Sequence, residues 1–374
     1  MIKILKNINL FKNIRNFINF ISKEKNLVFY SESGFYKKYF FELIEQLNIN
    51  KISVQYVSSD PNDQINLPFV ENYHLSNNFF KILFFLNIKC KYLFLTLTDL
   101  NNHSIKRNKY VKKYVYIFHA AISTHKSYTK KAFDNYDIIF CISKNQIDEI
   151  RKNEKINNLK KKELLKIGYF YLDLLRKNNT KLISSEKPKI LLAPSWNLNK
   201  NNFFNIYLNE LVDKILEINK YILILRPHPE HFKRSKDLIY EINHKYKNNS
   251  NFIFDNNIEN LKSMSESDLL ITDNSGISIE FLLGLKKPVI YFDRYEKIHN
   301  DKHREISSYT FEDQIKKEFG FHVNNPNFEK IENYIDEAKQ NFEFKKNMLD
   351  NFLKDNFFNL DNTAKKGLEF ITKN

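Results

Sequence analysis

The chain has 374 residues, of which 42% are hydrophobic and 15% aromatic, so it is not globally disordered and is long enough for two α/β domains. The formal net charge of +15 predicts attraction to something anionic, such as nucleic acid, an anionic lipid surface or an acidic polymer. Cys90 and Cys141 are the only cysteines, which excludes a disulfide framework. No stretch reads as a bilayer span or a cleavable signal, so we expect a cytoplasmic protein.

The first 25 residues form a candidate basic amphipathic helix. Apolar side chains recur there at helical spacing between lysines, at Ile4, Ile8, Phe11, Ile14, Ile18 and Ile21. One interpretation is a helix that lies on an anionic membrane surface, at the inner face of the cell membrane. The other is a helix that packs on its own domain.

Strands and helices then alternate, which favours a parallel sheet covered by helices. In the first half the expected strands are 26–30, 52–57, 92–96, 114–118 and 138–141, with a helix over 36–47. After a polar linker over 176–187, the second half has expected strands at 189–193, 221–225, 252–254, 269–272 and 288–292, and helices at 203–218, 258–264 and 277–283. We predict domains over 26–180 and 188–345, and a helical tail over 346–374.

Glycine usage limits how a phosphate group could be bound. The six glycines form neither a dinucleotide-binding fingerprint nor a P-loop. A phosphate site in this chain must therefore use side chains and helix N-termini, at the carboxyl ends of strands.

The most informative segment is 267–276, where an apolar strand ends in a polar turn before a helix. Free backbone N–H groups and the helix dipole at such a turn attract an anion. We therefore predict that Asp273, Ser275 and Gly276 bind phosphate, and that Glu280, one turn into the helix, holds ribose hydroxyls.

Two other strand ends carry residues suited to the same ligand. Arg226 and His228 follow the strand 221–225 on a backbone stiffened by two prolines, and Ser195 follows the strand 189–193. Arginine can clamp a phosphate and imidazole can donate to a phosphate oxygen. The spacing of His228, Glu230 and His231 matches no standard zinc site, so no metal and no other cofactor is predicted.

His119 is the candidate general base. It follows the strand 114–118 and precedes two small residues, Ala120 and Ala121, that leave room for a ligand. A histidine at a strand end can take a proton from an acceptor hydroxyl near neutral pH.

Taken together, these motifs resemble the CDP-glycerol glycerophosphotransferase family, whose members build teichoic acids and capsules. The matching segments run in the family's order over 92–297: 118–119, 193–196, 226–229, 267–276 and 287–291. The resemblance implies a GT-B-like fold, with two Rossmann-like domains facing a cleft and C-terminal helices. It also implies a membrane-associated enzyme that binds its acceptor in the N-terminal domain and CDP-glycerol in the C-terminal domain.

The same resemblance assigns roles to individual residues. His119 matches the family's catalytic base and His228 the histidine on the donor phosphate, while Asp273 and Ser275 match the donor motif. The sequence departs from the family at Ala120 and Ala121, and at Asn274 and Gly276. These departures leave the identity of the transferred group open: ribitol phosphate, another polyol phosphate or the sugar of a nucleotide sugar could replace glycerol phosphate.

We therefore expect transfer of glycerol phosphate from a CDP-linked donor to a hydroxyl of a cell-surface polymer or its lipid-linked precursor, with release of CMP. One alternative is a GT-B glycosyltransferase that uses a nucleotide sugar for capsule or lipopolysaccharide synthesis. A more distant alternative is a non-catalytic binder of nucleic acid or another polyanion. The chain carries no recognised nucleic-acid-binding module, so no nucleic-acid partner is expected.

Overall fold

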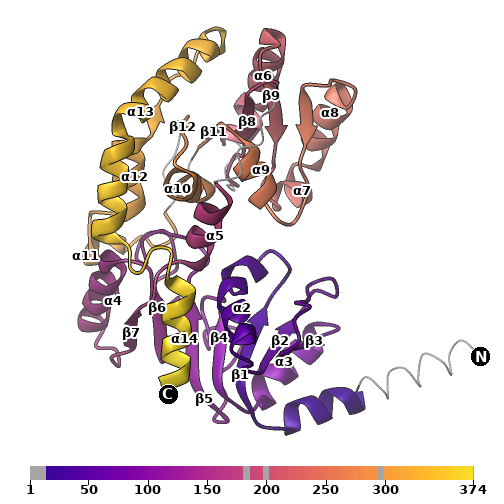
Figure 1. The fold of residues 1–374 in the computed structure, drawn as a ribbon, viewed down its shortest axis with the longest axis vertical. Helices are drawn as coiled ribbons and strands as arrows, with labels where there is room; N and C mark the ends of the chain where they lie inside the picture. The colour runs from indigo at the N-terminus through magenta and orange to yellow at the C-terminus, as the bar shows by residue number, and fades with distance from the viewer. Residues whose placement is uncertain (1–13, 180–185, 197–201, 274, 293–297, 374) are drawn as a thin grey trace, which may run out of the picture.

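The computed structural model describes residues 14–179, 186–196, 202–273, 275–292 and 298–373. The chain folds into two parallel sheets, each in its own α/β domain (Figure 1). The first sheet has the order β3-β2-β1-β4-β5-β6-β7 and the second the order β10-β9-β8-β11-β12-β13. In both sheets the order reverses beside the first strand, as in doubly wound nucleotide-binding folds. The predicted α/β class with two Rossmann-like domains is confirmed.

The strands of the first sheet are β1 (Lys25–Ser31), β2 (Val54–Ser58), β3 (Val70–His74), β4 (Cys90–Leu95), β5 (Val111–Ile117), β6 (Ile138–Cys141) and β7 (Glu163–Lys166). Those of the second are β8 (Lys189–Leu192), β9 (Ile222–Leu225), β10 (Phe252–Phe254), β11 (Leu269–Thr272), β12 (Val289–Tyr291) and β13 (Phe321–His322). The central strands are almost wholly apolar and buried, as expected for parallel strands covered on both faces. The edge strands β3, β7 and β13 were not predicted, because they are short and partly exposed, so hydrophobicity does not mark them.

Helices cover both sheets. They are a helix over 14–22, α2 (Phe41–Ile49), α3 (Asn78–Asn87), α4 (Lys144–Ile156), α5 (Phe170–Asn178), α6 (Phe203–Ile218), α7 (His231–Arg234), α8 (Lys236–Tyr246), α9 (Leu261–Glu266), α10 (Ile277–Glu280), α11 (His303–Ile306), α12 (Phe311–Phe319), α13 (Ile331–Asn356) and α14 (Thr363–Lys373). Short helical turns are η1 (Lys37–Tyr39), η2 (Phe281–Leu285) and η3 (Phe328–Lys330). The helix expected over 36–47 is therefore η1 followed by α2.

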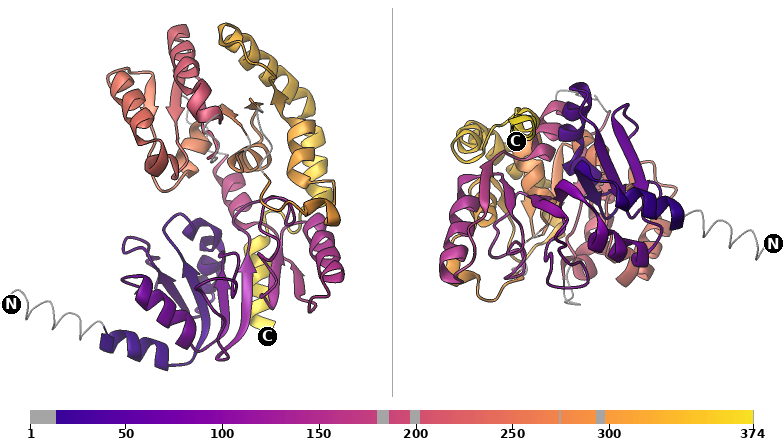
Figure 2. Two further views of the ribbon diagram at one scale, coloured as in Figure 1. Left: turned by 180° about the vertical axis from the view of Figure 1, so that it is seen from behind. Right: turned by 90° about the horizontal axis from the view of Figure 1, so that it is seen from below.

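The C-terminal segment joins the two domains. The helix α13 runs along the second domain, and α14 then returns to the first, beside its sheet (Figures 1 and 2). Leu368, Phe370 and Ile371 pack there on the apolar cluster of the first sheet. The boundary expected at 345 falls inside α13, because the helix continues unbroken to Asn356.

A close contact between α5 and η2 joins the two domains near Tyr169 and Glu280. A Cβ on Gly284 would lie 2.8 Å from the Leu175 Cβ, so glycine is what allows this approach. Because η2 continues from α10 and α5 begins at Phe170, the contact also places Glu280 beside Tyr169.

The described part of the N-terminal helix packs on its own domain. Phe17 and Phe20 are buried, and their rings contact Phe80 and Tyr73. Ile18, on the outer side, remains 53% exposed. Residues 1–13 of the expected amphipathic helix lie outside the described residues. In the described part of the chain, no helix has the length and apolar character needed to span a bilayer.

Candidate active site

The carboxyl ends of three neighbouring strands, β9, β8 and β11, carry the predicted donor-site residues of the second domain. Asp273 follows β11, and its carboxylate accepts two hydrogen bonds from Ser195, which follows β8. The backbone N–H and the Oγ of Ser195 each lie 2.7 Å from a different carboxylate oxygen. Burial raises the pKa of Asp273, while both hydrogen bonds from Ser195 oppose the shift. These two residues are therefore engaged with each other at the switch point of the sheet.

His231 reinforces the same loop from the other side. Its Nε2 lies 3.1 Å from the Ser195 carbonyl oxygen, and its ring stacks on Phe204 with centroids 3.7 Å apart. Burial lowers the pKa of His231 to about 4, so the ring is neutral and donates from Nε2. His231 is completely buried and acts on the site through the backbone of Ser195.

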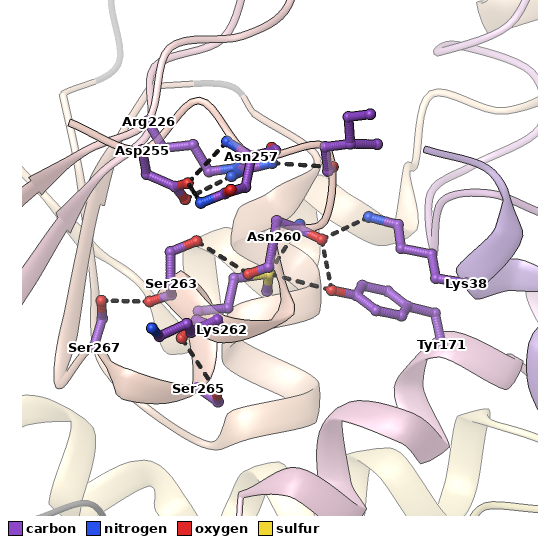
Figure 3. A network of polar contacts seen from close by, with 12 residues as sticks. Lys38, Tyr171, Arg226, Asp255, Asn257, Asn260, Lys262, Ser263, Ser265 and Ser267 are labelled. Carbon is purple, nitrogen blue, oxygen red and sulfur yellow. Dashed lines mark hydrogen bonds and ion pairs between the residues drawn. The ribbon is translucent and has the colours of Figure 1, made fainter. Parts of the chain in front are cut away.

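Arg226, at the end of β9, is held by hydrogen bonds within its own domain. Its guanidinium binds the Asp255 carboxylate at 2.6 Å and the carbonyl oxygens of Asn257 and Ile258 at 2.8 and 3.3 Å (Figure 3). These bonds hold the loop between β10 and α9. The bonded Nη1 and Nη2 point into this loop, which limits how Arg226 can clamp a phosphate.

His228 is half-buried on the loop after β9. Its Nδ1 accepts a hydrogen bond from the backbone N–H of Glu230 at 3.2 Å. A neutral ring with this contact carries its proton on Nε2, and that nitrogen is then a donor suited to an anionic oxygen.

The turn before α10 is the most open of the predicted positions. Gly276 is exposed, and among the described residues apart from its chain neighbours a Cβ there would meet no heavy atom within 4 Å. Ser275 is half-buried, and its carbonyl oxygen accepts a hydrogen bond from the Ser278 Oγ at 2.6 Å. Asn274 lies outside the described residues. The open surface leaves room for a ligand against the turn.

His119 lies beyond the end of β5, within a set of tyrosines. The rings of Tyr36, Tyr39 and Tyr128 pack edge-on around its imidazole, with centroids 5.7, 6.2 and 5.8 Å away. Tyr116 Oη lies 3.2 Å from the His119 Nδ1.

The charge state of His119 follows from this environment. Burial lowers its pKa to about 4, a hydrogen bond with the Thr96 backbone opposes the shift, and the positive charge of Lys38 adds to it. The imidazole is therefore neutral near pH 7, which is the form that can accept a proton.

Glu280 lies on the second domain but contacts the first. The Tyr169 hydroxyl donates to its Oε1 at 2.5 Å. Burial raises the pKa of Glu280, and the charge of Lys38 and the bond from Tyr169 oppose the shift. The ring of Tyr169 stacks with that of Tyr39, which also contacts His119, so aromatic rings link the two predicted residues across the domains.

The residues that connect these motifs were not predicted from the sequence; they are Tyr36, Lys38, Tyr39, Tyr128 and Tyr169. A lysine pair at the start of a helix is usually a solvated surface feature, and tyrosines are frequent in this chain. Only their position between the two domains singles them out.

Comparisons with known proteins identify the family and the fold. A family model described as CDP-glycerol:poly(glycerophosphate) glycerophosphotransferase matches residues 22–364. The wall teichoic acid polymerase TagF shares 16% identity with a TM-score of 0.62, over 100% of this chain and 96% of that structure. A substituted form of TagF soaked with CDPG shares 15% identity with the same TM-score, over 100% and 95% of the two chains.

A second kind of protein has a similar fold. UDP-GlcNAc 2-epimerase from Methanocaldococcus jannaschii shares 14% identity with a TM-score of 0.56, over 94% of this chain and 100% of that one. At these identities the structural matches show the fold alone. Comparison with curated protein sequences gives no significant match. The family model, however, covers most of the chain, from the helix before β1 to the start of α14, and the chain belongs to the CDP-glycerol:poly(glycerophosphate) glycerophosphotransferase family.

Proposed function

We propose that this enzyme transfers glycerol phosphate, or a closely related polyol phosphate, from CDP-glycerol to a hydroxyl group of a cell-surface polymer or its lipid-linked precursor. Membership in the family supports the donor and the reaction. The similarity in fold to TagF, described as a wall teichoic acid polymerase, supports a polymeric acceptor.

In the proposed step the acceptor hydroxyl oxygen attacks the β-phosphorus of CDP-glycerol. A new P–O bond forms, the bond from that phosphorus to the bridging oxygen breaks, and CMP leaves with the bridging oxygen and its electron pair. The hydroxyl proton passes to His119. No oxidant or reductant is needed.

The contact of His119 with the rings that connect it to the second domain is the observation that carries this assignment. The ring of His119 contacts that of Tyr39, which stacks on Tyr169. The Tyr169 hydroxyl in turn donates to Glu280 of the second domain. A pKa near 4 makes His119 a weak base in the free protein, but the negative charge of a bound diphosphate would raise that pKa toward the working pH.

We place the donor phosphates between the loop after β9 and the turn before α10. His228 can donate from Nε2, and Ser275 and the backbone at Gly276 lie at an open helix start. Asp273 and Ser195 shape this turn through their mutual hydrogen bonds, and Arg226 holds the adjoining loop. Glu280 is assigned to the ribose hydroxyls, with Tyr169 orienting its carboxylate.

We further propose that the enzyme works at the cytoplasmic face of the cell membrane. The support is the basic amphipathic pattern of residues 1–25, together with the positive net charge. The described residues 14–22 pack partly on their own domain, so the proposed membrane contact rests mainly on the segment before them.

Nucleotide release tests the function directly. The purified protein is incubated with an acceptor polymer and, separately, with CDP-glycerol, CDP-ribitol or a UDP-sugar. CMP release that requires both CDP-glycerol and acceptor is expected. Release of UDP from a UDP-sugar without turnover of CDP-linked donors would identify a glycosyltransferase instead.

A further inference from the structure

A buried lysine occupies the interface between the two domains. Lys38, on η1 of the first domain, is largely inaccessible to solvent, and its Nζ donates to the Asn260 Oδ1 of the second domain at 2.7 Å (Figure 3). The Tyr171 hydroxyl donates to the same oxygen at 2.8 Å. The ammonium also lies over the rings of Phe35 and Tyr171, at 4.3 and 4.4 Å from their centroids.

The N–H donors and the positive charge of this ammonium are only partly satisfied by the protein. The ammonium has three N–H donors, and the Asn260 oxygen is its one hydrogen-bond acceptor within the described residues. Among the described residues it forms no ion pair with a carboxylate, and the acidic charge that acts on it most strongly is that of Glu280. Aromatic faces stabilise a cation only in part, so a buried ammonium with unused donors is costly unless another partner completes it.

Its position matches the proposed reaction site. The charges that act on Lys38 are Glu280, Arg226 and Glu259, all from the second domain, and Lys38 in turn lowers the pKa of His119. Burial lowers the pKa of Lys38 to about 8, while Glu280 opposes the shift, so the group remains mostly protonated at neutral pH. The positive charge of Lys38 therefore acts on the assigned base His119 and the assigned ribose ligand Glu280, and its Nζ contacts the loop between β10 and α9 that Arg226 holds.

We infer that Lys38 binds a phosphate group of a substrate at this interface. A phosphate oxygen would supply the missing acceptor and counter-charge, and both the CDP-linked donor and a poly(glycerophosphate) acceptor carry one. The inference deepens the proposed function and rests on it for the identity of the substrates.

A purely structural role is the competing explanation, in which Lys38 only ties the domains together. The chain offers a matched control for this. Lys37, on the same turn, is more exposed and also bridges the domains, through an ion pair of 3.4 Å with Glu259. Loss of Lys37 removes an interdomain contact without touching the buried ammonium.

The experiment compares Lys38→Met, Lys38→Arg and Lys37→Met with the wild-type protein. Affinities for CDP and for cytidine are measured by competition against labelled CDP, and KM is measured for donor and acceptor. We expect Lys38→Met to weaken CDP about 10- to 100-fold with cytidine affinity unchanged, and Lys38→Arg to recover part of the loss. Lys37→Met should stay within about twofold of wild type on every measure.

Two results distinguish between a donor phosphate and an acceptor phosphate as the group that Lys38 binds. A selective loss of CDP affinity assigns Lys38 to the donor, whereas unchanged CDP affinity with at least a tenfold rise in acceptor KM assigns it to the acceptor. Equal losses for CDP and cytidine, or no change in CDP affinity and in both KM values, would overturn the inference. Should Lys38→Met fail to fold, Lys38→Arg decides the question, because it must change either the CDP-to-cytidine affinity ratio or the acceptor KM.

The wild-type protein serves as the reference for the reaction itself. If it binds CDP but releases no CMP from CDP-glycerol in the presence of acceptor, the proposed function fails, while the assignment of Lys38 to phosphate still stands on the CDP measurements.

Discussion

Ser195 and Asp273 form a two-point contact, in which the serine backbone N–H and its hydroxyl each donate to one carboxylate oxygen at 2.7 Å. Both residues were expected to touch donor phosphate. In the structure they contact each other and join the ends of the adjacent strands β8 and β11, where the strand order reverses and where nucleotides bind in folds of this type. A carboxylate beside a diphosphate would repel it, so a role in shaping the turn explains why an acidic residue is present there.

Replacing Asp273 should therefore weaken both stability and donor binding. In Asp273→Asn one side-chain oxygen becomes an amide nitrogen, which cannot accept from Ser195. The unfolding free energy should fall by about 1–3 kcal/mol in urea denaturation, and CDP affinity should fall with it. Asp301→Asn, the same substitution at an exposed position, is the control. Full stability in Asp273→Asn would show that the two hydrogen bonds contribute little.

The proposed base is tested by His119→Ala. Turnover with CDP-glycerol should fall by a factor of roughly 10² to 10⁴, because no other group is assigned to take the hydroxyl proton. CDP affinity should change little, since His119 is assigned to the acceptor hydroxyl. The measurement is CMP release at saturating donor, and near-normal kcat would remove His119 from the mechanism.

The pH dependence should differ between kcat/KM and kcat. In the free protein the pKa of His119 is lowered to about 4, so kcat/KM should be lost only as the pH falls well below the ordinary histidine range. A bound anionic donor stabilises the imidazolium and raises that pKa, so the acidic limb of kcat should lie at higher pH. Coincident acidic limbs in the two profiles would argue against this coupling.

Substitution of His228 should mainly affect CDP binding, whereas substitution of His231 should mainly affect stability. His231→Ala removes a buried ring that stacks on Phe204 and supports the Ser195 carbonyl, so it should lower the unfolding free energy by about 3 kcal/mol. His228→Ala, at a half-buried position, should leave stability nearly unchanged and weaken CDP binding. Thermal unfolding measures stability and CDP titration measures binding. Loss of stability in His228→Ala together with loss of CDP affinity alone in His231→Ala would contradict the two assignments.

Removal of residues 1–13 tests the membrane proposal. The truncated protein keeps Phe17 and Phe20, which pack on the first domain, and should therefore remain folded. Its binding to anionic liposomes should fall, with each lost basic residue contributing about 1 kcal/mol near the surface, and high salt should weaken the intact protein in the same way. Neutral liposomes provide the control. Equal binding with and without the segment would contradict the proposal.

The amino-acid sequence by itself determined the α/β class, the central strands and the positions of the strand-end motifs. Buried parallel strands are continuous apolar runs, and the polar turns after them are equally local, so both can be recognised without a structure. The helix predicted near 203–218 has these ends in the structure, where an Asn202 side chain caps its start and Asn219 ends it in a left-handed conformation.

Only the tertiary structure decided which groups act together. The contacts of Ser195 with Asp273, of Tyr169 with Glu280 and of Lys38 with Asn260 join residues 78, 111 and 222 positions apart. No local pattern encodes such pairs, because they depend on strand order, on the close approach of α5 to η2 at Gly284, and on how the two domains meet. For the same reason no sequence pattern marks Lys38, which the fold buries at the domain interface, where its charge acts on the assigned catalytic base.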